Sequence, residues 1–186
     1  LIFTPSHKVK SLRTFIYSKP NIKSKILSYL SFNSLVKISS TKSGFCKIQN
    51  LGWCPTSDLS KISEKKFNIV NLARQFLNTP YYWGGRDSQG IDCSGLIQNI
   101  MQMKNINFPR DTDMQEEFCT MSIPRKNLKA GDLVFWKGHV ALMTEKNRII
   151  HANAFHMKTQ EEALVTAEKR IFKTNGKVRK YARIIS

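Results

Sequence analysis

The chain has 186 residues, 41% of them hydrophobic, which is enough for one ordinary core or two small ones. It contains no apolar run long enough to span a bilayer, so we expect no transmembrane helix. The 30 Lys and Arg residues against 13 Asp and Glu give a net charge of +17. These charges are scattered along the chain, and no base-stacking or groove-reading motif accompanies them. We therefore interpret them as a solvated surface and expect no nucleic-acid partner.

Residues 1–60 have the pattern of a small β-unit. Residues 9–17 alternate loosely between apolar and polar side chains, and Pro20 and Asn21 mark a turn. Three further apolar runs follow at the spacing expected of a small barrel, at 27–30, 35–38 and 45–48. Gly52 and Trp53 form a corner, at which we expect Trp53 to anchor the core. The stretches 14–20 and 44–48, together with this corner, resemble a bacterial SH3-like domain, which implies a targeting or substrate-gating module.

Beyond residue 60 the spacing of apolar residues along the chain changes. Residues 60–66 are polar and charged, and we interpret 61–66 as a linker. From Phe67 to the C-terminus, helical patterns come first and strand patterns later, which favours an α+β arrangement with an antiparallel sheet. The sequence predicts one helix over 69–77, a second from Cys93 to 103 and a third that follows Pro109 and ends at Phe118. It predicts strands over 133–136, 139–144 and 148–152. Residues 121–126 and 158–168 carry no specific pattern and are expected to form peripheral loops and turns.

Cys93 stands at the expected start of a helix. Asp92 before it is a good N-cap, so Cys93 lies in the first turn, where unpaired amides and the helix dipole favour a thiolate. The neighbouring Asp92 carboxylate opposes that effect, and a histidinium partner would offset the opposition. The alternative is that Cys93 is an inert buried side chain.

Two histidines make a catalytic role for Cys93 more plausible. His139 begins an apolar strand after a Lys-Gly turn, and His151 occurs in the next apolar strand, twelve residues on. Adjacent antiparallel strands can place both imidazoles on one sheet face. His139 could then take the thiol proton while His151 fixes its tautomer. The alternative is two ordinary histidines. His7 and His156 have no comparable context.

Six sequence blocks, in order, resemble the NlpC/P60 family of papain-like cysteine peptidases of the bacterial cell wall. With the SH3-like module in front, the resemblance is closest to the dipeptidyl-peptidase VI-type enzymes, which cleave after γ-D-glutamate in free muropeptides. The blocks are Thr-Pro-Tyr-Tyr-Trp-Gly-Gly at 79–85, Asp-Cys-Ser-Gly-Leu-Ile at 92–97, Pro-Arg-Asp-Thr at 109–112, Ala-Gly-Asp-Leu-Val-Phe at 130–135, Gly-His-Val-Ala at 138–141 and Ile-His-Ala at 150–152.

The resemblance implies a papain-like catalytic domain over 67–186 and a role for each matching residue. Cys93 is the nucleophile, His139 the base and His151 the orienting third member. The Cys93 backbone N–H is a candidate oxyanion donor. The implied subsite for an N-terminal L-alanine and γ-D-glutamate contains Tyr81, Asp92, Ser94, Arg110 and Thr112. Within it, Asp92 can pair with a free peptide amine and Arg110 with a carboxylate, although Arg110 could instead form an ion pair with a nearby acid.

The expected activity is hydrolysis of the γ-D-glutamyl–diamino acid bond of peptidoglycan stem peptides or muropeptides through a Cys93 thioester, with no metal and no cofactor. A papain-fold amidase or acyltransferase and a non-catalytic wall-binding module are the alternatives. Cys46, Cys54, Cys93 and Cys119 form no C-x-x-C pair, and the chain does not need disulfides. This favours a reducing, cytoplasmic compartment. Export to the periplasm or cell wall is the alternative if a signal precedes Leu1.

Overall fold

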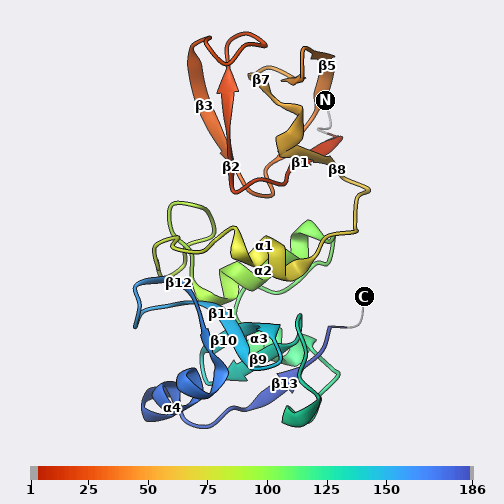
Figure 1. Cartoon of the computed structure of the whole chain (residues 1–186). Coiled ribbons are helices and arrows are strands. Elements are labelled where there is room, and N and C mark those ends of the chain that lie inside the picture. The colour runs from red at the N-terminus through yellow and green to blue at the C-terminus, as the bar shows by residue number, and fades with distance from the viewer. Residues whose placement is uncertain (1–3, 185–186) are drawn as a thin grey trace. The chain divides into compact units, whose positions relative to one another are not determined.

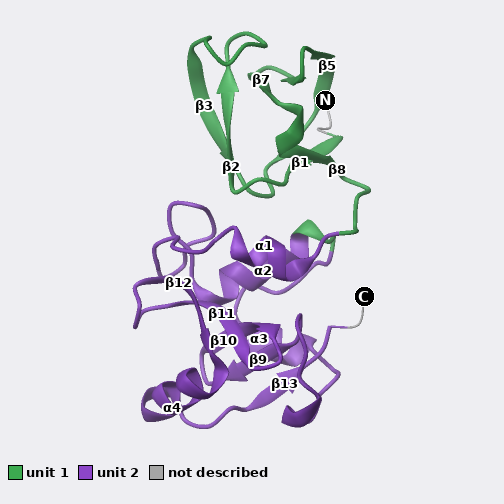
Figure 2. Ribbon diagram, in the orientation of Figure 1, with its two compact units in different colours: residues 1–66, 103–105 green, residues 67–102, 106–186 purple. Residues whose placement is uncertain are grey.

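The computed structural model describes residues 4–184, which form two compact units (Figures 1 and 2). One unit runs to Lys66 and includes Met103–Asn105. The other holds Phe67–Gln102 and the chain from Ile106 onward. No helix in the described part of the chain combines the length and the apolar character needed to cross a membrane.

The N-terminal unit consists of short strands in two antiparallel sheets. One sheet has the order β4-β1-β8 and the other the order β3-β2-β7-β6-β5. A buried cluster of small and branched side chains, including Val9, Ile16 and Val36, forms its own core. The strands are β1 (His7–Val9), β2 (Arg13–Tyr17), β3 (Ile26–Ser31), β4 (Leu35–Val36), β5 (Ile38–Lys42), β6 (Phe45–Ile48), β7 (Gly52–Pro55) and β8 (Leu59–Lys61), with a 3-10 turn at Thr56–Asp58.

Two expectations about this unit need correction. Trp53 is only partly buried and lies outside the core cluster, with the Lys47 ammonium 5.9 Å from its ring centroid. The β7 alternation explains this, because the neighbouring Cys54 points into the core and Trp53 must point away from it. Ser60 and Lys61, which were expected to open the linker, belong to strand β8 and pair with β1.

The second unit is built on a five-stranded antiparallel sheet with the order β12-β11-β10-β9-β13. Its helices and central strands agree closely with the expected segments, although α1 ends earlier and is followed by turns. The helices are α1 (Ile69–Arg74), α2 (Cys93–Met103), α3 (Thr112–Phe118) and α4 (Leu164–Asn175), with a 3-10 turn at Arg125–Asn127. The strands are β9 (Leu133–Trp136), β10 (His139–Glu145), β11 (Arg148–Asn153), β12 (Lys158–Ala163) and β13 (Lys180–Ala182).

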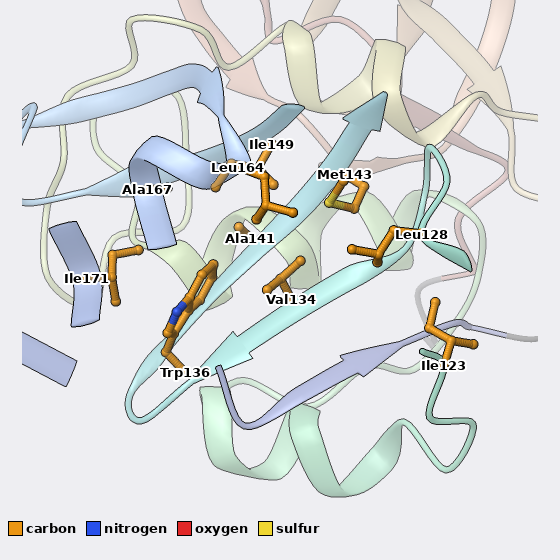
Figure 3. Close-up of a cluster of buried hydrophobic side chains, with 10 residues drawn as sticks. All are labelled: Ile123, Leu128, Val134, Trp136, Ala141, Met143, Ile149, Leu164, Ala167 and Ile171. Atoms are coloured by element: carbon orange, nitrogen blue, oxygen red, sulfur yellow. The ribbon is translucent and has the colours of Figure 1, made fainter. Parts of the chain in front are cut away.

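Apolar side chains cover both faces of this sheet. Helix α4 packs on one face through Leu164, Ala167 and Ile171, which join Trp136 and Met143 in one buried cluster (Figure 3). Helix α2 lies on the other side of the sheet (Figures 1 and 3). Because both faces are buried, β9 reads as an unbroken apolar run, and all four of its residues are buried.

The expectation of peripheral loops over 158–168 is wrong. Residues 158–163 form β12, which pairs with β11 over its whole length, and α4 begins at Leu164. Residues 158–162 of this strand are all polar or charged, and the apolar signal that identified the other strands is therefore missing. Strand β12 is stabilised by its pairing with β11 and by ion pairs, which a hydrophobic pattern does not reveal.

Candidate active site

Cys93 is the first residue of α2, as expected. The Asp92 carboxylate accepts a 2.7 Å hydrogen bond from the backbone N–H of Gly95, and the Asp92 carbonyl accepts the bond from Leu96. Asp92 therefore caps the helix. Gly95 is required here because a Cβ at this position would lie 2.6 Å from the Gly85 carbonyl oxygen, in the loop that leads to the site.

The Cys93 side chain is 7% exposed and is surrounded by hydrogen-bond donors. The backbone N–H groups of Val140 and Ser94 donate to its sulfur, and the Thr112 hydroxyl lies 3.8 Å from it. Burial nevertheless raises the pKa of the thiol, and the nearby Asp92 charge adds to this. Burial of Cys93 therefore opposes the thiolate that the helix start was expected to favour.

His139 and His151 lie on adjacent strands and on the same sheet face. Leu142 of β10 pairs with Ile150 of β11, so continuing this register sets His151 opposite Ala141, two residues from His139. Residues two apart in a strand share a face, and diagonal neighbours are within side-chain reach. The Nε2 atom of His139 lies 2.8 Å from Nδ1 of His151, as a base and its orienting partner require.

The environment of this pair favours neutral imidazoles. Burial lowers the pKa of His139 well below 6.5, and the positive charges of His151 and Arg170 lower it further. Burial also lowers the pKa of His151, although a hydrogen bond to Glu162 offsets part of the effect. Neutral histidines can accept a proton, which is the property that a general base needs.

Sequence reasoning missed Glu162 and Arg170. The Glu162 carboxylate lies 2.7 Å from Nε2 of His151, and Arg170 of α4 donates to both of its oxygens at 2.8 and 2.5 Å. Burial raises the pKa of Glu162, but the hydrogen bonds from Arg170 and His151 outweigh it and lower the pKa to about 2. The available signal was a Glu-Glu pair nine residues beyond Ala152, which has no meaning until β12 is placed beside β11.

Two cavities meet at Cys93. One, of about 480 Å³, contains Cys93, His139 and His151 in its lining, so the three expected catalytic residues face one space. The other, of about 700 Å³, contains all five residues expected to bind substrate: Tyr81, Asp92, Ser94, Arg110 and Thr112. Trp83, which is 81% exposed, lines both cavities, and Lys137 lines the larger one.

Asp92 and Arg110 are paired with each other in the larger cavity. The Arg110 guanidinium donates to both Asp92 oxygens at 2.6 and 3.0 Å, and to the Ser94 hydroxyl at 2.8 Å. The backbone N–H of Gly84 also donates to Asp92. In this structure Arg110 therefore forms an ion pair with a nearby acid, Asp92, which is the alternative that the sequence left open.

One group of side chains in the described part of the chain has the spacing of metal ligands. Ligand atoms of His151, His156 and Glu162 all lie within 4.8 Å of one another. Arg170, however, occupies both Glu162 oxygens with a fixed positive charge. A cation at this position would have to displace that guanidinium, so the group does not fit an open metal site.

A cysteine at a helix start, with two histidines on an antiparallel sheet, is the arrangement typical of a papain-like cysteine hydrolase fold. The model of the NlpC/P60 family matches residues 78–174, more than half of the chain. The chain therefore belongs to the NlpC/P60 family, and its catalytic unit has the α+β fold of that family.

Individual relatives agree with this assignment. Dipeptidyl-peptidase 6 of Lysinibacillus sphaericus is 36% identical over 100 residues, covering 50% of this chain and 37% of that protein. The gamma-D-glutamyl-L-lysine dipeptidyl-peptidase of Bacillus cereus is 28% identical over 164 residues, covering 82% of this chain and 46% of its own length. The chain thus spans less than half the length of these relatives.

A solved structure shows the same fold over most of the chain. The crystal structure of an NlpC/P60 family protein from Bacillus cereus superposes with a TM-score of 0.81 at 23% identity, covering 98% of this chain and 64% of that one. At this identity the likeness concerns the fold alone.

Proposed function

We propose that the protein is a cysteine peptidase that hydrolyses the γ-D-glutamyl–diamino acid bond of peptidoglycan stem peptides or muropeptides. The observation that carries the proposal is the cavity of about 700 Å³, in which Cys93 is joined by all five residues expected to bind the dipeptide end of such a substrate. The names of the relatives, dipeptidyl-peptidase 6 and gamma-D-glutamyl-L-lysine dipeptidyl-peptidase, support the same bond.

Acylation begins with a proton transfer from Cys93 to His139. The sulfur attacks the γ-carbonyl carbon of D-glutamate, and the imidazole takes the thiol proton as the S–C bond forms. Burial disfavours each separate ion, so the transfer occurs as a carbonyl is attacked rather than in the resting site. The C–N bond then breaks, and the diamino acid leaves with the proton from His139 on its amine.

Deacylation repeats these steps with water. His139 takes a proton from water as the oxygen attacks the thioester, and the proton returns to the Cys93 sulfur when the acid is released. The backbone N–H of Cys93, in the first turn of α2, has no acceptor within the helix and is the candidate oxyanion donor. This reaction needs no oxidant, and water is its second nucleophile.

The paired charges of Asp92 and Arg110 fit the proposed dipeptide end. A free amine can approach the Asp92 carboxylate, and the α-carboxylate of D-glutamate can approach the Arg110 fork. Both ions are already held in place by their mutual bonds and by those to Gly84 and Ser94, so little ordering is required on binding.

The alternative functions are less well supported. An amidase or acyltransferase on this fold would not require the five cavity residues to face Cys93. A non-catalytic wall-binding module would not require Cys93, His139 and His151 to line one cavity. We further propose that the N-terminal β-unit is an SH3-like gating or targeting module. The four free, buried cysteines support the proposal that the protein works in a reducing, cytoplasmic compartment.

The test uses L-Ala-γ-D-Glu-L-Lys and the corresponding meso-diaminopimelate tripeptide, each with a free and an N-acetylated amine. We expect release of the diamino acid from the free peptides and a thioester of L-Ala-γ-D-Glu on Cys93, detectable by mass spectrometry after acid quench. Cys93→Ala should abolish both signals. Cys119→Ala, which replaces another buried free thiol, is the matched control and should retain activity.

Two results would decide against parts of this proposal. If the unmodified protein cleaves none of the four peptides, the peptidase assignment fails. If it cleaves acetylated and free peptides equally well, the peptidase assignment stands but recognition of a free amine by Asp92 does not.

A further inference from the structure

A hydrogen-bonded relay of three side chains from three adjacent strands ends at His139, in the cavity that Cys93 also lines. Glu162 of β12 is 2.7 Å from Nε2 of His151 in β11, whose Nδ1 is 2.8 Å from Nε2 of His139 in β10. His151 is fully buried, and the Glu162 side chain is 12% exposed. Among the described residues, none donates to or accepts from the other His139 nitrogen, Nδ1, within this relay.

The ionised Glu162 carboxylate determines which nitrogen of each histidine carries a hydrogen. An ionised carboxylate only accepts, so the Nε2 of His151 must carry a hydrogen. In a neutral imidazole the other nitrogen then has the lone pair, so the Nδ1 of His151 accepts from the Nε2–H of His139. The lone pair of His139 is thereby left on Nδ1, the position from which it can take a proton.

Arg170 keeps the carboxylate ionised and oriented. Its guanidinium donates to both Glu162 oxygens and lies 4.4 Å from the centroid of the Phe155 ring. The charged or titratable groups that face His151 are His139 from β10, Glu162 from β12, Arg170 from α4 and, 3.9 Å from the same carboxylate, His156 from the loop after β11.

We propose that Glu162, held by Arg170, is a positioning residue that sets the tautomers of both histidines. With Glu162 as the final acceptor, His139 donates to His151 and His151 donates to Glu162. His139 therefore presents the lone pair of its Nδ1, and not a hydrogen, to the thiol. This inference rests on the proposed role of Cys93 as nucleophile. It adds a fourth member to the catalytic group and gives β12 and α4 a function in catalysis.

Removal of the Glu162 carboxylate should reverse the direction of the hydrogen bond between His151 and His139. In Glu162→Ala, the Arg170 guanidinium is the group left near Nε2 of His151, and it can only donate. That nitrogen must then hold the lone pair, Nδ1 of His151 becomes the donor, and His139 carries its hydrogen on Nδ1. The imidazole would remain in place but would be unable to act as the base.

The test combines three measurements on full-length Glu162→Ala. In the ¹⁵N spectrum of histidine-labelled protein, we expect both histidines as Nε2–H tautomers in the wild type and as Nδ1–H tautomers in the variant. With tripeptide substrate, kcat should fall by about 10²–10⁴-fold while KM changes little, the loss typical of a misprotonated base. Alkylation of Cys93 by iodoacetamide at neutral pH, followed by mass spectrometry, should slow.

Two further comparisons separate positioning from general structure. Added formate should restore part of kcat in Glu162→Ala and should not raise it in the wild type. Glu161→Ala, the neighbouring carboxylate on the other face of β12, should leave the tautomers, kcat and Cys93 alkylation unchanged. If Glu162→Ala does not fold, Glu162→Asp keeps the carboxylate farther from His151 and should give an intermediate kcat with Nε2–H tautomers.

The outcomes also distinguish this inference from the proposed function. Changed tautomers and slower alkylation in Glu162→Ala support the inference even if no tripeptide is cleaved by the wild type. A folded Glu162→Ala with wild-type tautomers and wild-type alkylation of Cys93 overturns it, whatever the substrate. Equal losses of kcat in Glu161→Ala and Glu162→Ala would likewise overturn it, since the effect would then be structural.

Discussion

At the scale of single residues, burial decides the charge state of the site. The thiol of Cys93 and the imidazole of His139 are both shielded from water, which raises the pKa of the first and lowers that of the second. Each group is therefore neutral near pH 7, and the pair holds one transferable proton. The active form is lost only when that proton leaves or when a second one arrives.

We therefore expect a wide plateau of kcat/KM against pH. Protonation of His139 should reduce kcat/KM only below pH 6.5, and loss of the Cys93 proton only above pH 9, because the two pKa values are displaced in those directions. The measurement is kcat/KM on the tripeptide, which reports the ionisation of the free enzyme. An acid limb with its midpoint above pH 6.5 would contradict the lowered pKa of His139.

At the scale of elements, β12 separates two carboxylates by its alternation. Glu162 faces His151 and Arg170, as described above. Glu161 points to the opposite face, where it accepts hydrogen bonds from Arg74 of α1 at 3.1 and 3.0 Å and from Thr144 of β10 at 2.7 Å. The strand thus contacts α1 and β10 through Glu161, and His151 through Glu162.

Glu161 should contribute to stability in a defined pH range. The hydrogen bond from Arg74 lowers its pKa to about 2, despite the opposing effect of burial. A pKa below the unfolded value means that the contribution is complete above about pH 4.5 and is lost as the pH falls toward 2. We expect Glu161→Gln to lower the free energy of unfolding by about 1–2 kcal/mol at pH 7, allowing for solvent screening, and by much less near pH 2.

Urea unfolding at pH 7, 4 and 2.5 measures this difference. Glu117→Gln, at an exposed position in α3, is the control and should follow the wild type at every pH. A constant difference between Glu161→Gln and the wild type from pH 7 to 2.5 would contradict the assignment of the effect to ionisation.

At the scale of the whole molecule, the described part of each unit contains a buried hydrophobic cluster of its own. One includes Ile16 and lies within the N-terminal sheets, and the other includes Ile149 and lies between the second sheet and α4. Ile16 is 2% exposed and Ile149 is 0% exposed, so the two side chains are equally well buried. Each unit therefore has an apolar core of its own with which to fold.

Matched substitutions should show this independence. Ile16→Ala and Ile149→Ala each remove the same buried atoms, and each should destabilise its own unit by about 2–5 kcal/mol. Hydrogen exchange with mass spectrometry should show faster exchange in 4–66 for the first variant, and in 67–102 and 106–184 for the second. Faster exchange in both units for either variant would instead indicate one cooperative molecule.

Local patterns predicted much of the fold and the residues with the most direct chemistry. Asp92 before an apolar helical period identified the start of α2, and apolar runs identified β9, β10 and β11, with a histidine in each of the last two. The strand β12 was not predicted, because residues 158–162 are polar or charged and its pairing with β11 across a turn leaves no local pattern. Trp53 was misplaced because a large aromatic in a small β-unit can occupy either face.

The sequence by itself determined the α+β class, the family and the place of Cys93 at a helix start, because these depend on short-range periodicity, capping and ordered blocks. The tertiary structure decided what depends on distant segments meeting. Burial raises the pKa of Cys93. Asp92 and Arg110, eighteen residues apart, neutralise each other in the cavity. Pairing of β12 with β11 brings Glu162 to His151, and no local pattern contains that contact.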